Sequence, residues 1–278
     1  MVALLDMYVV FLIMMNRNRH LFATHRIILL ALLMVRASLS HCQYPFEKYA
    51  AISYVEHTNW VMYDRSEKEK KIHHTITVPK FFSNADTLTV QLTSFIGNWD
   101  SSYIRVYRNK KQIQRFFEPM GFSQSQIFEP MFTADINSDG LTDVKLLIPY
   151  MGCGLASLNV RVIYLFQKGN GSFTKISFND MMSENNNSMA GNRPERDFDG
   201  DKNFEIITMT LKGYEGHNYW LFNLYDFVDG ELKNVNVKDD YPIMIQFLIR
   251  ENYTITDKLT RLKMKEFSMP LPERYNKQ

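Results

Sequence analysis

From residue 73 onward, short apolar stretches follow one another along the chain, and several of them alternate with polar positions. A period of two is typical of strands with one buried face. These stretches are rich in β-branched and aromatic residues, and turn-forming residues separate them. Helical periodicity is confined to the N-terminal segment and to a stretch near residues 256–266. We therefore expect strands within residues 76–78, 87–92, 103–107, 144–149, 160–166, 204–211 and 219–225.

Three segments between or beside these strands carry further expectations. Residues 179–196 are polar, with a run of asparagines, and predict a long exposed loop. The basic residues 105–111 predict a solvated hairpin. Residues 214–220 admit two interpretations: an aromatic surface offered to a partner, or the start of a core strand at Tyr219 and Trp220.

An acidic nine-residue segment directly precedes the expected strand at residues 144–149. Oxygen-bearing side chains stand at its positions 1, 3, 5 and 9, a glycine at position 6 permits a sharp bend, and position 7 offers a backbone carbonyl. A chain wraps a calcium ion in this way, because calcium takes six to eight oxygen ligands. The predicted ligands of this first acidic loop are Asp135, Asn137, Asp139, Leu141 and Asp143.

A second acidic loop repeats this spacing and also precedes an expected strand. Its predicted calcium ligands are Asp197, Asp199, Asp201, Asn203 and Glu205. Lys202 occupies the position at which the first loop has Gly140, so its ammonium group either weakens the site or points to solvent. For both loops the alternative is a turn that binds nothing, because Asp, Asn and Gly favour turns by themselves.

Neither loop is an EF-hand. An EF-hand needs a bidentate Glu at position 12 and a helix on each side. Position 12 is Leu146 in the first loop and Thr208 in the second, and a short apolar run ending at Pro149 follows the first loop. The sequence therefore predicts a loop followed by a strand.

The two acidic loops belong to a longer repeat. They begin 62 residues apart, and the pairs Asn170-Gly171 and Asp229-Gly230 follow 59 residues apart. Such pairs favour type I′ hairpins. Residues 104–113 form a weaker third copy of the repeat, and no acidic loop precedes it. The repeat predicts four-stranded antiparallel sheets of about 60 residues, each with a cation loop before a strand.

The segments 134–144 and 196–206 resemble the FG-GAP or VCBS-type calcium-binding repeats, which carry a D-x-[DN]-x-D-G-x-x-D loop just before a strand. The second segment departs from this pattern at Lys202 and Glu205. The resemblance covers about residues 125–235 and implies an all-β fold of propeller-like blades with structural calcium. About 235 mature residues allow three or four blades, so a partial propeller is expected.

The N-terminal 42 residues have the features of a secretory signal. Arg17, Arg19 and Arg26 precede an apolar run at residues 27–35, and small residues follow as far as Ser40. The run is too short to span a bilayer, although together with apolar residues 8–15 it admits a membrane anchor. The start of translation lies at residue 1 or at Met14 or Met15.

The two cysteines leave several alternatives open. Cys42 follows the signal and suggests lipidation, although His41 fits a lipobox poorly and cleavage after Ser40 is as plausible. Export permits a disulfide between Cys42 and Cys153, and two free thiols are equally plausible.

We therefore expect four regions: a signal peptide or membrane segment at residues 1–40, an N-terminal β region at 44–120, two calcium-loop repeats at 121–240, and a C-terminal extension at 241–278.

Charge and motifs narrow the function. The net charge of +2 without a concentrated basic face argues against nucleic-acid binding. The sequence has no G-x-S-x-G, H-E-x-x-H or Cys/His arrangement that indicates catalysis. The expected function is that of an exported, calcium-stabilised, non-enzymatic binding or scaffold protein at the cell envelope, with a protein or glycan partner. The alternatives are a periplasmic inhibitor of a cell-wall-degrading enzyme, as in some small proteins of the resembling family, and a calcium-dependent glycan hydrolase.

Overall fold

The computed structural model describes residues 45–66, 71–95, 98–119, 130–149, 159–181, 194–228, 230–237, 240–248, 252–255 and 259–278. Residues 46–278 belong to one compact unit. The predicted signal, Cys42 and Cys153 lie outside the described residues. Within the described ranges, no helix has the length and apolar character needed to cross a membrane.

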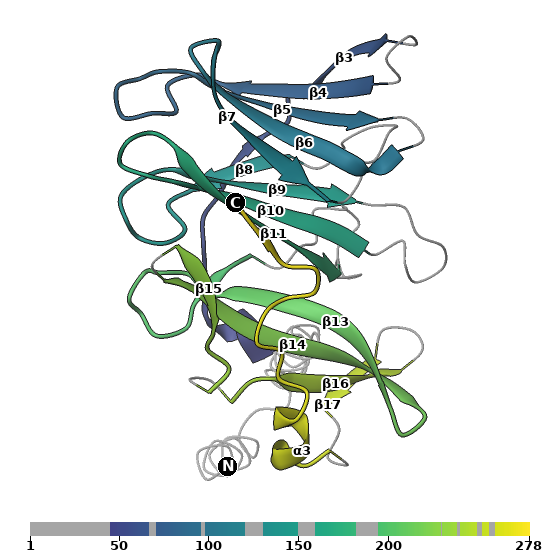
Figure 1. Ribbon diagram of the computed structural model, residues 1–278. Coiled ribbons are helices and arrows are strands. Elements are labelled where there is room, and N and C mark those ends of the chain that lie inside the picture. The colour runs from purple at the N-terminus through teal and green to yellow at the C-terminus, as the bar shows by residue number, and fades with distance from the viewer. Residues whose placement is uncertain are drawn as a thin grey trace, which may run out of the picture. The chain divides into compact units, whose positions relative to one another are not determined.

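The fold is mostly β, as predicted, and its strands form three main antiparallel sheets (Figure 1). The first sheet has five strands in sequence order: β3 (Val61–Ser66), β4 (Lys71–Val78), β5 (Leu88–Phe95), β6 (Asn98–Arg108) and β7 (Lys111–Glu118).

The second sheet has six strands, in the order β18 (Asn276–Lys277), β11 (Phe173–Met181), β10 (Asn159–Gln167), β9 (Asp143–Pro149), β8 (Met131–Ala134) and β2 (Val55–His57). The third sheet has five strands: β13 (Ile206–Tyr214), β14 (His217–Val228), β16 (Ile243–Leu248) and β17 (Asn252–Ile255) in that order, with β15 (Glu231–Asn234) also paired to β14. None of these sheets closes on itself along its strand order.

Short elements complete the described chain. They are the 3-10 helix η1 (Pro45–Lys48), the paired strands β1 (Ala50–Ala51) and β12 (Arg196–Asp197), and the helix α3 (Arg261–Lys265). Helix α3 falls in the stretch that helical periodicity indicated, and the Thr260 side chain accepts a hydrogen bond from the Lys263 N–H at its N-terminus.

The expected strands are confirmed as β4, β5, β6, β9, β10, β13 and β14, although β5 begins at Leu88 and β13 at Ile206, after the starts of the expected segments 87–92 and 204–211. Strand β10 explains why residues 162–166 are continuously apolar. Ile163 and Leu165 pack in the core shared with the first sheet, whereas Val162 and Tyr164 pack in the core shared with the third sheet. A strand buried on both faces shows no alternation of polarity.

Two hydrophobic cores join consecutive sheets. In one core, Ile76, Val90 and Ile104 of the first sheet pack with Leu146 and Ile163 of the second. In the other, residues of β9, β10 and β11 pack with residues of the third sheet, and the rings of Phe166 and Phe227 stack with centroids 3.6 Å apart. The second sheet therefore has buried residues on both of its faces.

A smaller cluster covers the other face of the third sheet. Tyr219, Leu221 and Met244 pack there against Leu259 and Met264 from the α3 segment. Tyr219 and Trp220 are thus core residues, so the prediction of a presented aromatic surface is wrong at these two positions, and the core-strand interpretation is correct.

The polar stretch 179–196 is not exposed at its described ends. Asn179, Asp180 and Glu195 are buried, and residues 182–193 lie outside the described residues. Glu195 pairs with the Lys145 ammonium at 2.6 Å and accepts hydrogen bonds from the Tyr54 and Tyr164 hydroxyls. The polar side chains here satisfy one another inside the fold, which composition alone does not reveal.

Both hairpin predictions are correct in position, and the turn type differs from the prediction at the first hairpin. Strands β10 and β11 form a hairpin, yet only Gly171 has a positive φ, whereas a type I′ turn needs two such residues in succession. The β6–β7 hairpin, where the basic stretch lies, does have two, at Asn109 and Lys110. Gly230 also has a positive φ, and Asp229 lies outside the described residues.

Strand pairing crosses the expected region boundaries. Strands β1 and β2 from the N-terminal region pair with β12 and β8. Strand β16 extends the third sheet and β18 extends the second, although both come from the expected C-terminal extension.

Candidate metal centre

The first acidic loop connects β8 to β9 and is organised by its own side chains. The Asp135 carboxylate accepts the N–H groups of Asp139 at 3.1 Å and Gly140 at 2.9 Å. The Asp139 carboxylate accepts the Leu141 N–H at 2.8 Å and an Asn137 amide N–H at 3.1 Å. The side chains of positions 1, 3 and 5 are therefore held together around one bend of the backbone.

Asp143, at position 9, is fully buried beneath this bend. Its two carboxylate oxygens accept the backbone N–H groups of Ile136 at 3.0 Å and Gln167 at 2.8 Å. Burial raises the pKa of Asp143 to about 7; the two N–H donors oppose this rise, and Asp139 and Asp135 add to it. Asp143 thus ties the loop to β10.

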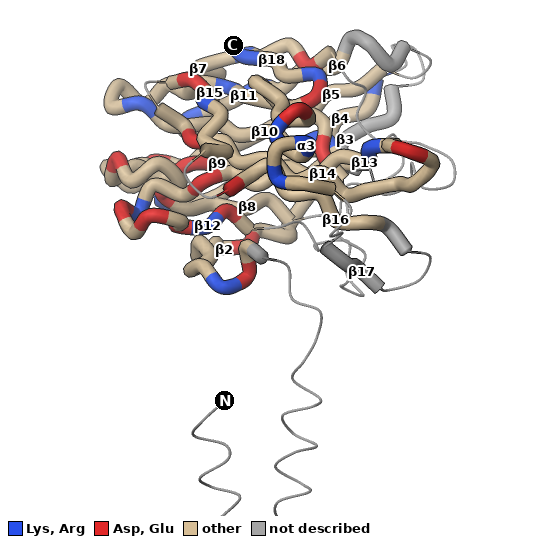
Figure 2. The backbone as a smooth tube through the Cα atoms, turned by 90° about the horizontal axis from the view of Figure 1, so that it is seen from below, with Lys and Arg blue, Asp and Glu red and all other residues tan. Residues whose placement is uncertain are grey.

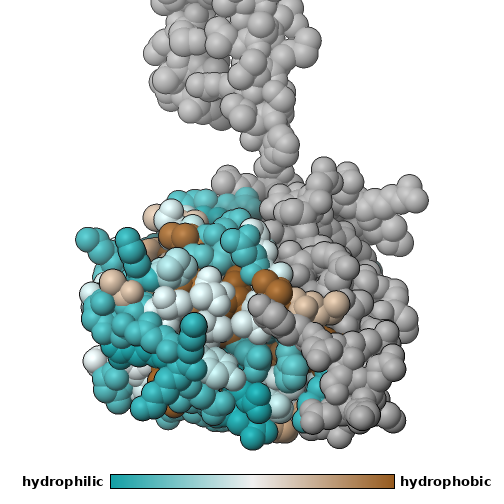
Figure 3. Space-filling model, turned by 90° about the horizontal axis from the view of Figure 1, so that it is seen from above, coloured by the Kyte–Doolittle hydropathy of each residue, from teal (hydrophilic) through white to brown (hydrophobic). Residues whose placement is uncertain are grey.

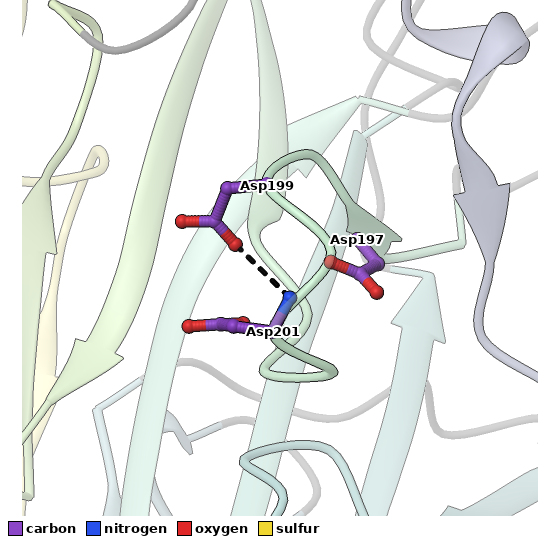
Figure 4. A group of neighbouring side chains, drawn as sticks. All are labelled: Asp197, Asp199 and Asp201. Carbon is purple, nitrogen blue, oxygen red and sulfur yellow. Dashed lines mark hydrogen bonds between the residues drawn. The ribbon is translucent and has the colours of Figure 1, made fainter.

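The second acidic loop leads into β13 and brings three carboxylates together. One oxygen of each of Asp197, Asp199 and Asp201 lies within 4.8 Å of the others. Figure 4 shows the three side chains around a single turn. Asp197 accepts the Gly200 N–H at 2.6 Å, and Asp201 accepts the Asn203 N–H at 2.8 Å. Three carboxylates around one turn form a donor set suited to a hard divalent cation.

Glu205, at position 9, repeats the role of Asp143. It is buried, and its Oε2 accepts the Phe198 N–H at 3.0 Å, from position 2 of the loop. Burial raises the pKa of Glu205 to about 7, the Phe198 N–H lowers it, and Asp199 and Asp226 raise it further.

The backbone conformations of the two loops also correspond. Position 4 is left-handed in both, with φ of 57° at Ser138 and 83° at Gly200. Position 6 is left-handed as well, with φ of 80° at Gly140 and 70° at Lys202. Lys202 therefore replaces glycine in a conformation that side chains rarely adopt, and its exposed side chain lies at the surface.

The strand register at the two loops is the same. The residue before position 1 pairs with position 9 in each case: Ala134 with Asp143, and Arg196 with Glu205. The loops are also joined directly, because the Phe204 N–H donates to the Ile136 carbonyl at 3.0 Å. Figure 2 shows acidic residues gathered where β8, β9 and β12 lie.

The structure thus brings together Asp135, Asn137 and Asp139 in one loop and Asp197, Asp199 and Asp201 in the other. The predicted ligands Asp143 and Glu205 are turned toward backbone N–H groups. Asn203 donates to Asp226 at 2.6 Å, and no described hydrogen-bond donor reaches its buried Oδ1. The sequence pattern does not indicate Asp226, because this residue lies in an apolar strand, β14, with no motif around it.

Comparisons with protein families, curated proteins and solved structures find no match to this chain. The likeness to FG-GAP or VCBS-type repeats therefore rests on the loop pattern alone.

Proposed function

We propose that this chain is an exported, non-enzymatic binding or scaffold protein whose two acidic loops bind calcium. In this proposal the first ion is held by Asp135, Asn137, Asp139 and the Leu141 carbonyl, and the second by Asp197, Asp199 and Asp201 with Asn203. Asp143 and Glu205 complete the two sites from beneath.

The observation that carries the proposal is the correspondence between the loops. Two segments 62 residues apart share left-handed positions 4 and 6, a buried acidic residue at position 9 that accepts the N–H of position 2, and one strand register. A turn formed by chance has no need of such agreement. Without a cation, each loop also concentrates carboxylates that repel one another.

The role proposed for the ions is to brace the junction of the second and third sheets. The backbone hydrogen bond between Phe204 and Ile136 joins the two loops at this junction. A cation that neutralises each loop fixes where β9 and β13 enter their sheets. On this basis we interpret the sheets as propeller-like blades of an FG-GAP or VCBS kind, arranged as a partial propeller.

A calcium titration followed by thermal unfolding tests the proposal. At free calcium a hundredfold above Kd, one site that binds only the folded state adds about 2.7 kcal/mol, or roughly 5–10 °C in Tm. Asp139→Asn and Asp201→Asn keep an oxygen that can accept the N–H of Leu141 or Asn203 and remove one charge each. We expect each variant to fold without calcium and to lose much of the shift.

Glu273→Ala, which removes an exposed carboxylate outside both loops, is the control and should keep the full shift. If calcium leaves the Tm of the unaltered protein unchanged, or if both Asn variants keep the whole shift, the proposal is wrong.

A further inference from the structure

The outward face of the first sheet differs in character from the other sheet faces. Along β4, β5, β6 and β7, the residues Ile76, Val90, Ile104 and Phe116 point into the core shared with the second sheet. Successive side chains of a strand point to opposite faces of its sheet, so the residues next to these four in sequence point away from the second sheet. Figure 1 shows no described element beyond the first sheet on that side, and Figure 3 shows hydrophilic and intermediate residues there with small hydrophobic patches.

Two arginines lie side by side on this outward face. Arg105 of β6 and Arg115 of β7 are direct cross-strand partners. Both guanidinium groups lie over the ring of Tyr103, at 4.8 Å for Arg105 and 4.2 Å for Arg115 from the ring centroid. The shared aromatic ring holds the two planar cations next to each other.

No carboxylate neutralises this pair among the side chains that the structure describes on the face. Neither arginine forms an ion pair there, and the buried Nε of Arg105 has no hydrogen-bond acceptor. Like charges on directly opposed residues destabilise a sheet. The fold therefore maintains an unfavourable juxtaposition that an anionic ligand would relieve.

A row of neutral polar groups continues from the arginines across the sheet. Thr75, Gln91, Arg105 and Arg115 are successive cross-strand partners. The Gln91 side-chain oxygen accepts hydrogen bonds from the Arg105 guanidinium and from the Tyr107 hydroxyl, each at 3.3 Å. The Gln91 side-chain NH₂ group donates to the Thr75 hydroxyl at 3.5 Å. The row presents hydroxyl and amide groups beside two cations.

We propose that this face binds an acidic polysaccharide. In this proposal Arg105 and Arg115 bind a sugar carboxylate, and the side chains of Thr75, Gln91 and Tyr107 bind neighbouring hydroxyls. This inference deepens the binding role proposed above, and it names the site and the class of partner. Guanidinium groups form paired hydrogen bonds to carboxylates. Hydroxyl-rich sugars match a row of hydroxyl and amide side chains.

An acidic peptide fits the same face less well. An extended peptide binds sheets mainly through backbone hydrogen bonds at an edge strand. Here the polar row crosses four strands from β4 to β7, and of its members only Arg115 stands on the edge strand β7. The interacting groups are therefore mostly side chains on the face of the sheet rather than main-chain groups at its edge.

Titration calorimetry with a hexamer of galacturonate, at saturating calcium, tests the proposal. We expect binding to the full chain, no binding of a neutral galactose hexamer, and weaker binding of a glutamate hexamer. Arg105→Gln and Arg115→Gln should each weaken galacturonate binding at least tenfold, since each removes a guanidinium that forms charge-assisted hydrogen bonds to the carboxylate. Arg105→Lys with Arg115→Lys keeps the charge but should also bind at least tenfold more weakly.

The control variant is Lys168→Gln with Lys265→Gln, which removes two exposed positive charges away from this face and should bind normally. Failure of galacturonate to bind, equal binding of the glutamate hexamer, or full binding by the lysine double variant would each overturn the inference. The calcium-dependent Tm shift of the arginine variants separates the two proposals, because it should persist whether or not the polysaccharide binds.

Discussion

At the scale of single residues, the two acidic groups at position 9 matter most. Asp143 and Glu205 lie under their loops with pKa values raised to about 7, and burial is the main cause. In the unfolded chain such carboxyl groups titrate near pH 4. The folded protein therefore holds more protons on these two groups between these values. Without metal, the contribution of these two groups to stability is fully present below about pH 4 and is lost as pH rises through 7.

The raised pKa values of Asp143 and Glu205 predict opposite effects of pH on the metal-free stability and on the stabilisation by calcium. With a chelator, Tm should fall between pH 5 and 8, whereas the increment that calcium adds to Tm should grow, because calcium binds the ionised carboxylates. Thermal melting at pH 5, 6, 7 and 8 measures both. Glu205→Gln keeps an acceptor for the Phe198 N–H and should flatten the metal-free dependence. An increment that shrinks toward pH 8 would contradict the prediction.

At the scale of elements, the two loops adopt the same backbone bend with different residues. Position 6 is glycine in the first loop and lysine in the second, at φ of 80° and 70°. A left-handed backbone costs a side-chain-bearing residue about 1–2 kcal/mol. A Cβ added at Gly140 meets no atom within 4 Å, so conformation alone decides the effect of substitution there.

Gly140→Ala should therefore lower the free energy of unfolding by about 1–2 kcal/mol, or Tm by roughly 2–8 °C. Lys202→Gly should raise the free energy of unfolding by about 0.5–1 kcal/mol. The relief of left-handed backbone strain at this position slightly exceeds the conformational freedom that glycine adds to the unfolded chain. Chemical denaturation with chelator present measures both. Gly169→Ala, at an open position without a left-handed φ, is the control. A neutral Gly140→Ala would show that the loop adjusts freely.

The elements themselves follow from local patterns, and the sheets do not. Alternation, β-branched residues and turn pairs placed β4, β5, β6, β9, β10, β13 and β14, whereas β3, β8, β16 and β17 were not among the expected strands. The loop spacing likewise gave Asp197, Asp199 and Asp201 as neighbours. No local pattern indicates that β2 pairs with β8, that β18 pairs with β11, or that Asp226 contacts Asn203. Such pairings depend on which surfaces remain uncovered once the sheets have packed.

At the scale of the whole unit of residues 46–278, the sheets are joined by charge as well as by apolar cores. Glu118 of the first sheet pairs with Arg161 at 2.9 Å and Lys175 at 3.1 Å, both from the second sheet, and all three are almost fully buried. Arg161 also donates to Ser177 at 3.0 Å and to the Arg274 carbonyl at 2.8 Å. This network sets how the two sheets align.

Removing the shared anion should be costly, because it leaves two buried cations without a counter-charge. We expect Glu118→Gln to destabilise the protein by about 3–5 kcal/mol, and Tm to fall by roughly 6–20 °C. The matched variant Glu118→Leu, Arg161→Met, Lys175→Met removes all three charges and should recover most of that loss, since an apolar replacement needs no counter-charge. Thermal melting and chemical denaturation measure both variants. If the triple variant unfolds as readily as Glu118→Gln, the hydrogen bonds of Arg161 to Ser177 and to the Arg274 carbonyl, rather than the balance of charge, hold the first two sheets in register.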